Sequence, residues 1–142
     1  DWYGFKMEAY DAIKENIPFV HNAGGCAIVH SDDPNGIQRL NQEAAKSLGD
    51  GIRAGVPHLS EAVAWTWLSR NPAKALGILD KTGTLAPGKM ADVVLWNGDP
   101  FSGYTRPERV WIDGALMYDA NDPKRRPVSD FELGQPGEGD VK

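Results

Sequence analysis

The feature that most constrains the fold is a short apolar run that ends in two acidic residues. It reads Cys-Ala-Ile-Val-His-Ser-Asp-Asp over residues 26–33, and Pro34 follows it. An apolar run of this length, rich in β-branched residues, is typical of a buried strand. Polar side chains at the carboxyl end of such a strand are where α/β sheets and barrels place their chemistry. We therefore expect an α/β fold with a candidate site at residues 31–33.

Composition narrows the class of protein. The chain has 142 residues, 41% of them hydrophobic, and a formal net charge of −5, which indicates a globular domain and argues against nucleic acid as a partner. No apolar run reaches the roughly 18 residues of a membrane span, so no membrane partner is expected. The single cysteine, Cys26, fits a reducing compartment such as the cytoplasm and is predicted to be a small buried hydrophobe. The first residue is Asp1 and not Met, so we expect the natural amino terminus to lie outside this sequence.

Helical periodicity dominates the rest of the first 80 residues. The predicted helices run over residues 7–16, ending near Pro18, then over 34–52, from Ser60 onward and over 73–76. Asp33 and Ser60 are the predicted N-caps of the second and third helices. Asn71 and Pro72 are interpreted as the cap and first position of the last helix.

The composition changes at Lys81, after which strand and turn signals replace helical periodicity. Pro87-Gly88 suits a type II turn, and an apolar strand is predicted over residues 91–96. Asp113-Gly114 separates two alternating runs, which is a strong hairpin signal. Residues 81–118 are therefore predicted to form a small antiparallel sheet.

Two stretches carry a family resemblance. The first is Val-His-Ser-Asp-Asp-Pro at residues 29–34. The second is Asn-Pro-Ala-Lys-Ala-Leu-Gly-Ile at 71–78, with Gly-Thr-Leu-Ala-Pro-Gly-Lys-Met-Ala-Asp-Val-Val-Leu-Trp at 83–96. The first resembles the last barrel strand of metal-dependent amidohydrolases, in the branch similar to imidazolonepropionases, and the second resembles their passage from the barrel into a small β-sandwich.

This resemblance implies the last strand and helices of a (β/α)₈ metal-dependent hydrolase barrel, followed by part of a small antiparallel β-sandwich. A complete barrel takes about 250 residues, so the chain is expected to be the last third of an enzyme and incomplete as a fold on its own. Residues 1–80 are then the carboxyl-terminal part of the barrel, 81–118 a sandwich segment and 119–142 an irregular tail. The family's paired His-x-His does not occur, because the three histidines stand apart in the sequence.

Asp32 is the catalytic residue that the resemblance implies, at the carboxyl end of the eighth barrel strand. The expected cofactor is a divalent metal, with Zn²⁺ as the first candidate. Such an ion lowers the pKa of bound water to about 7, and a carboxylate beside it can take a proton from this water and pass it to the leaving nitrogen. Asp32 is in this role also a metal ligand, and the remaining ligands are expected outside this chain. Strand alternation places Ile28, His30 and Asp32 on one face. From the residues alone, Asp32 and Asp33 are explained as well by helix capping.

Other polar residues near the strand end are weaker candidates. His30, Asn35 and Arg39 are candidate substrate contacts, although an interior hydrogen-bonded histidine and a solvated helical turn explain them too. The tryptophans at 65, 67, 96 and 111 favour packing between elements over a binding platform. The corner at 87–89 lacks the glycine spacing of a phosphate loop and is interpreted as a structural turn.

The sequence thus leaves two functions open. The first is a segment of an amidohydrolase that hydrolyses a C–N bond in a small amide, cyclic amide or dipeptide-like substrate. It is expected to be inactive without the missing amino-terminal part of the same enzyme. The second is a stand-alone, non-catalytic binding or structural module of the same fold. A homo-oligomer stays open in both cases, and residues upstream would set the substrate and the metal.

Overall fold

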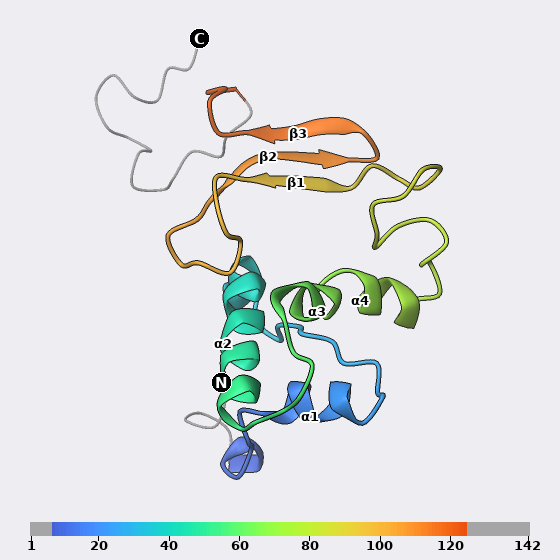
Figure 1. The fold of residues 1–142 in the computed structure, drawn as a ribbon. Helices are drawn as coiled ribbons and strands as arrows, with labels where there is room; N and C mark the ends of the chain where they lie inside the picture. Colours follow the sequence, from blue (N-terminus) through green and yellow to red (C-terminus); the bar gives the residue numbers. More distant parts are fainter. Residues whose placement is uncertain (1–6, 125–142) are drawn as a thin grey trace, which may run out of the picture.

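A computed structural model of the chain describes residues 7–124, in which short helices lie on one side of a small antiparallel sheet (Figure 1). The helical elements are η1 (Met7–Ala9), α1 (Asn16–Asn22), η2 (Gly36–Arg39), α2 (Leu40–Arg53), α3 (Glu61–Thr66) and α4 (Arg70–Ala75). The strands are β1 (Val93–Trp96), β2 (Pro107–Ile112) and β3 (Ala115–Asp119). The predicted combination of α/β class and antiparallel sheet is confirmed. None of the described helices is long and apolar enough to cross a bilayer.

The amino-terminal helix differs from its prediction. Periodicity predicts a helix over 7–16 that ends before Pro18, whereas the structure has one 3₁₀ turn and then α1, with Pro18 as its third residue. Proline is tolerated there because the first-turn N–H groups of a helix have no intrahelical acceptor. The Pro18 ring is fully buried against α2, where a Cβ added to Gly51 would lie 2.6 Å from the Pro18 Cβ and Cγ atoms. Glycine at position 51 therefore permits the close approach of the two helices.

The helical core is centred on Trp67, whose side chain is fully buried. The edge of the His21 ring faces it, with 5.8 Å between ring centroids. The indole N–H of Trp67 has no acceptor among residues 7–124. Around the indole pack five small or aliphatic side chains, Ala27, Val29, Ala44, Leu48 and Ala64. This core joins the connection between α1 and α2 to helices α2 and α3.

The sheet has the strand order β1-β2-β3 within the described residues, with both pairs antiparallel. Val110 in the central strand faces Val94 on one side and Tyr118 on the other. Asp113 and Gly114 have φ angles of 48° and 79°, so both central residues of the β2–β3 turn adopt the left-handed conformation of a type I′ hairpin. The predicted hairpin is confirmed.

The passage from α4 to β1 is held by its own turn. The Lys89 N–H donates to the Ala86 carbonyl at 3.2 Å and Gly88 has a φ of +83°, as a type II turn requires. The Lys89 ammonium group donates to the Leu79 carbonyl and, at 2.6 Å, to Thr84 Oγ1. Lys89 thus ties the loop together from within, which agrees with the structural interpretation of the corner at 87–89.

Aromatic side chains fill the contact between helices and sheet. The Trp65 ring on α3 meets the Trp96 ring of β1 edge to face at 6.4 Å, and the Phe101 ring in the same way at 5.5 Å. Asn41 of α2 adds a polar contact, because its Nδ2 donates to the Pro100 carbonyl at 2.5 Å. The predicted packing role of these tryptophans is confirmed for Trp65 and Trp96.

Candidate functional site

The segment with the candidate catalytic acid runs between α1 and α2 without strand pairing in the described residues (Figure 1). The sequence predicts a buried strand over residues 26–32. A strand needs backbone hydrogen bonds to a neighbouring strand, whereas Ala27 and Val29 are hydrogen-bonded to residues of the helical region. The side chains nevertheless alternate in burial as they do in a strand. The described residues thus form no strand here, because no strand lies beside them, while the alternating burial agrees with the predicted two faces of the segment.

This alternation separates a packed face from an open face. Ala27 and Val29 are only 3% and 6% exposed and belong to the helical core, whereas His30 and Asp32 are exposed. Cys26 is also exposed, which corrects the prediction that it is buried. Its position is in phase with His30 and Asp32 and not with the core-facing residues. His30 and Asp32 therefore share the open face that alternation predicted for them.

The packed face is fixed by hydrogen bonds from the helices. The Val29 N–H donates to the Trp67 carbonyl at 3.1 Å, and Asn71 Nδ2 donates to the Ala27 carbonyl at 2.8 Å. The Cys26 thiol lies 3.7 Å from the Asn71 carbonyl, which it donates to. Residues 38 to 45 positions apart in the sequence are thereby joined along residues 26–29.

Asn71 corrects its predicted role as a helix cap. Helix α4 begins at Arg70, Ser69 occupies the N-cap position, and the Asn71 side chain is 6% exposed inside the first turn. The Asn-Pro pair suggested a cap because such pairs commonly start helices. The α4 sequence also has Arg70 and Lys74, so a polar residue at position 71 gives no local signal for the observed role.

The two acidic residues at the end of the segment differ in their surroundings. The Asp33 carboxylate accepts the Gly36 N–H at 2.8 Å and the Asn35 N–H at 3.3 Å. Ser31 Oγ donates to the Asp33 carbonyl at 2.8 Å. Asp33 therefore stabilises the turn into η2, in line with its predicted capping role. The helix predicted to start at residue 34 is in the structure the 3₁₀ turn η2, which starts at Gly36, followed by α2, which starts at Leu40. Asp32 points to the exposed side of the same corner.

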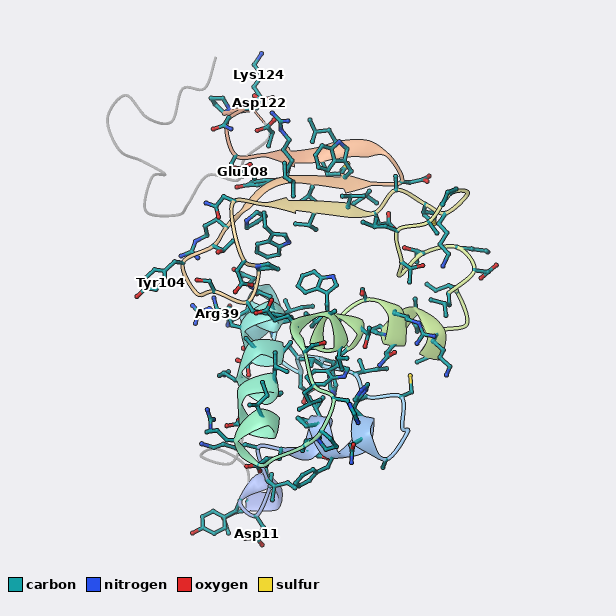
Figure 2. The ribbon with its side chains drawn as sticks, in the orientation of Figure 1. Asp11, Arg39, Tyr104, Glu108, Asp122 and Lys124 are labelled. Carbon is teal, nitrogen blue, oxygen red and sulfur yellow. The ribbon has the colours of Figure 1, made fainter. Side chains whose placement is uncertain are left out.

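The remaining candidates lie farther along the chain. Asn35 is exposed at the start of η2, and Arg39 ends this turn. Arg39 lines a shallow depression of about 610 Å³ together with the outer face of α2 and Phe101, and neither His30, Asp32 nor Asn35 lines it. Figure 2 shows Arg39 at the start of α2, on the side of the molecule where the loop with Tyr104 projects. The structure thus groups His30 with Asp32 but does not bring Arg39 into a cavity with them.

A second, more apolar hollow of about 740 Å³ lies between helices α3 and α4 and strand β1. Trp65, Pro72, Leu85 and Val94 contribute to its walls, with Arg70 and Asp92 among its few charged residues. None of the residues predicted for the site lines this hollow. It lies between the helical layer and the sheet, and the hydroxyl group of Thr82 in its wall is hydrogen-bonded to the Asp92 carboxylate at 2.6 Å.

The described residues do not make a metal site by themselves. No group of three or more His, Cys, Asp or Glu side chains in residues 7–124 is placed to hold an ion. A catalytic zinc site takes three protein ligands and one open position. The exposed Asp32 carboxylate suits one ligand of such a site, and the other ligands would have to come from outside residues 7–124.

Comparison with known proteins gives a consistent family. The model of the amidohydrolase family matches residues 20–126. The chain is 32% identical over 116 residues to amidohydrolase tasK of Hapsidospora irregularis, a match that covers 81% of this chain and 11% of that protein. Over 41 residues it is 54% identical to an imidazolonepropionase of Aromatoleum aromaticum, which covers 29% of this chain and 10% of that protein.

A solved structure gives the same result. The crystal structure of an amidohydrolase from Thermotoga maritima matches 81% of this chain with a TM-score of 0.65 and 34% sequence identity, and the match covers 28% of that chain. The chain therefore spans about a tenth of the length of the curated relatives and just over a quarter of the solved structure. The family model covers most of the chain, and relative and structure agree with it. The chain belongs to the amidohydrolase family.

Proposed function

We propose that this chain is the carboxyl-terminal segment of an amidohydrolase that hydrolyses a C–N bond in a small amide, cyclic amide or dipeptide-like molecule. The observation that carries the proposal is the segment ending at Asp32. One of its faces is packed on helices, and its other face presents His30 and Asp32 without a neighbouring strand among residues 7–124. The short share of each relative that the chain covers supports the proposed segment nature.

In this proposal residues 26–32 are the last strand of a (β/α)₈ barrel, and strands from the amino-terminal part of the same enzyme complete it. Residues 1–80 are the end of the barrel and 81–118 a sandwich segment. The irregular tail proposed for 119–142 overlaps β3 by one residue, because Asp119 is the last residue of that strand, and residues 125–142 lie outside the described part of the chain. An unpaired strand position is an aggregation hazard, which is a physical reason for such a completion.

The proposed chemistry centres on Asp32. A divalent metal, Zn²⁺ in the first place, would act as a Lewis acid and supply an activated water molecule. One Asp32 oxygen would serve as a ligand, and the carboxylate would accept a proton and return it to the leaving nitrogen. His30, on the same face, and Asn35 are proposed to contact the substrate. Arg39 is proposed to pair with a substrate carboxylate.

Asp32→Asn in the complete enzyme tests this role. The variant keeps the size of the side chain but loses the proton acceptor, so kcat should fall about 10²–10⁴-fold on whichever substrate the wild type hydrolyses. The substrates to screen are a hydantoin, an N-acyl amino acid, a dipeptide and imidazolonepropionate. Asp33→Asn is the matched control, because an asparagine oxygen still accepts the Gly36 N–H, and its kcat should stay within a few-fold of wild type. Full activity of Asp32→Asn, or an equal loss in both variants, would contradict the proposal.

The isolated 142-residue chain separates this function from the non-catalytic module. As a segment it should show neither turnover nor stoichiometric Zn²⁺ binding, and in size-exclusion chromatography it should self-associate or bind an added amino-terminal part. A cooperatively melting monomer that ignores the amino-terminal part would favour the module. Turnover together with tight stoichiometric Zn²⁺ binding by these residues alone would refute the segment hypothesis.

A further inference from the structure

We infer that Asn71 is a positioning residue for the proposed site, because its side-chain amide fixes the segment that carries Asp32. The inference depends on the proposed role of Asp32 and deepens it. Asn71 lies on α4 and does not reach the open face, so it acts through the backbone of the segment and not on a substrate.

The first argument is the burial of the amide and its acceptor. Asn71 is 6% exposed and Ala27 is 3% exposed, and the Nδ2-to-carbonyl distance between them is 2.8 Å. A buried carbonyl without a partner is rare in folded proteins because it loses its bond to water without replacement. The Ala27 carbonyl has Asn71 in place of a neighbouring strand. An apolar side chain at position 71 would leave this carbonyl unpaired.

The second argument is the pattern of contacts along the segment. In a strand, the backbone polar groups of residues two apart point to the same edge. Ala27 and Val29 are two apart, and the first is held by Asn71 and the second by the Trp67 carbonyl at 3.1 Å. Trp67 directly follows the last residue of α3, and Asn71 lies in the first turn of α4. The α3–α4 region therefore holds one edge of the segment through two hydrogen bonds.

These two hydrogen bonds lie in the first half of the segment, whereas Asp32 lies at its end. Asp32 lies three positions after Val29, about 10 Å of extended chain, and it is exposed. A small rotation at Ala27 is therefore carried to the carboxylate. Misplacing a catalytic group by about 1 Å costs on the order of 10²-fold in rate. We therefore expect loss of the Asn71 amide to lower kcat more than it changes KM.

The chain offers a matched control in Asn41. Its Nδ2 also donates to a distant backbone carbonyl, that of Pro100, at 2.5 Å. This bond ties α2 to the loop before β2 and does not touch residues 26–32. Asn71→Ala and Asn41→Ala therefore remove the same kind of bond, and only the first releases the segment.

The experiment compares these variants in the complete enzyme. Asn71→Ala should lower kcat about 10- to 100-fold with KM within three-fold, roughly, of wild type, whereas Asn41→Ala should keep kcat within about two-fold. Asn71→Asp has the same shape but presents an acceptor instead of a donor, so it should lose activity without creating a cavity. Equal kcat losses in Asn71→Ala and Asn41→Ala, or normal kcat in Asn71→Asp, would overturn the inference.

Hydrogen exchange supplies a readout that does not depend on activity. Backbone amides of residues 26–32 should exchange faster in Asn71→Ala than in Asn41→Ala, and in the wild type they should exchange together with residues 67–71. If the variants do not fold, the wild-type measurement decides. Independent exchange of residues 26–32 and residues 67–71 would contradict the inference that Asn71 holds the segment. An active Asp32→Asn enzyme would refute the proposed function instead, and the exchange data would still show whether Asn71 holds the segment.

Discussion

The segment ending at Asp32 and the β2–β3 hairpin are both strand-like in sequence, yet they are held in opposite ways. The hairpin is closed by the left-handed pair Asp113-Gly114 and by pairing between residues close in the chain, with an Arg109–Asp119 ion pair of 2.9 Å across the two strands. The segment has no such ladder among residues 7–124 and depends on bonds from Trp67 and Asn71. Alternating sequence therefore sets which side of a segment is buried, while turn chemistry sets whether it pairs locally.

This difference predicts separate responses to damage. The hairpin carries its own folding information, because its turn and its partners are neighbours in sequence. The conformation of the segment depends on hydrogen bonds from the helical region, so its backbone amides should lose protection whenever the helices are destabilised. In an enzyme of the proposed kind, the acid would then depend on helices that do not touch the substrate.

Trp67→Ala should have the largest effect on this comparison. The indole is fully buried at the centre of the helical core, and truncating a buried tryptophan typically costs about 3–5 kcal/mol of unfolding free energy. Guanidinium unfolding of the complete protein measures this cost, and hydrogen exchange should show residues 26–32 losing protection before the hairpin does.

Trp65→Ala is the control for that variant. Trp65 packs on Trp96 and Phe101 between the layers and not beneath the segment, so its loss should loosen the contact with the sheet instead. Equal loss of protection in the segment and the hairpin of Trp67→Ala would show that the two regions unfold as one unit and would remove the distinction drawn between them.

Features encoded by near neighbours could be predicted from the sequence. The hairpin follows from Asp113-Gly114, and the start of α3 from Ser60, whose Oγ accepts the Val63 N–H at 3.3 Å. The capping bonds of Asp33 and the shared face of His30 and Asp32 also depend only on local spacing. All of these are decided within a few residues of chain.

Features decided by distant partners could not be predicted. The sequence predicts that a helix ends near Pro18, but in the structure Pro18 is the third residue of α1 and its ring packs closely against Gly51. The sequence predicts Asn71 as a helix cap from the adjacent Pro72. Its actual acceptor, the Ala27 carbonyl, is 44 residues away and cannot be seen from local sequence. The roles of Asp32, His30, Asn35 and Arg39 stay predictions for the same reason, since residues 7–124 do not bring a metal-binding group of side chains to them.

Gly114→Ala should have an intermediate effect that is confined to the hairpin. Gly114 has a φ of +79°, and a Cβ there would meet only the Ala91 Cβ, at 4.0 Å. The cost is therefore backbone strain alone, about 1–2 kcal/mol for an L-residue in the left-handed region. Hydrogen exchange should rise in residues 107–119 and stay unchanged in residues 26–32.

Gly103→Ala provides the comparison for that variant. A Cβ at Gly103 has no neighbour within 4 Å, and no positive φ is required there, so its unfolding free energy should stay within about 0.5 kcal/mol of wild type. Increased exchange of residues 26–32 in Gly114→Ala would mean that the segment senses the hairpin after all.

The smallest expected effect concerns Asp92 and depends on pH. Its carboxylate accepts the Thr82 hydroxyl hydrogen at 2.6 Å and the Asp113 N–H at 2.9 Å, and these two bonds lower the pKa of Asp92 below its usual range. A lowered pKa in the folded state stabilises the fold fully above the unfolded-state pKa of about 3.9, and this contribution is lost as the pH falls through the folded-state value. Because Asp92 is exposed, the contribution is small.

Hydrogen exchange from about pH 6 to about pH 3, corrected for the intrinsic rate, measures this contribution by comparing wild type with Asp92→Ala. The difference in hairpin protection should be largest near neutral pH and should shrink in acid as the wild-type carboxylate becomes protonated. The bonds from Asn71 and Trp67 to the segment involve amide and carbonyl groups, which do not titrate, so the protection of residues 26–29 should not follow the same curve. A difference in hairpin protection that stays constant across this pH range would mean that Asp92 stabilises the turn by shape and not by charge. A parallel loss of protection in residues 26–29 would mean that the hydrogen bonds holding the segment are coupled to the hairpin.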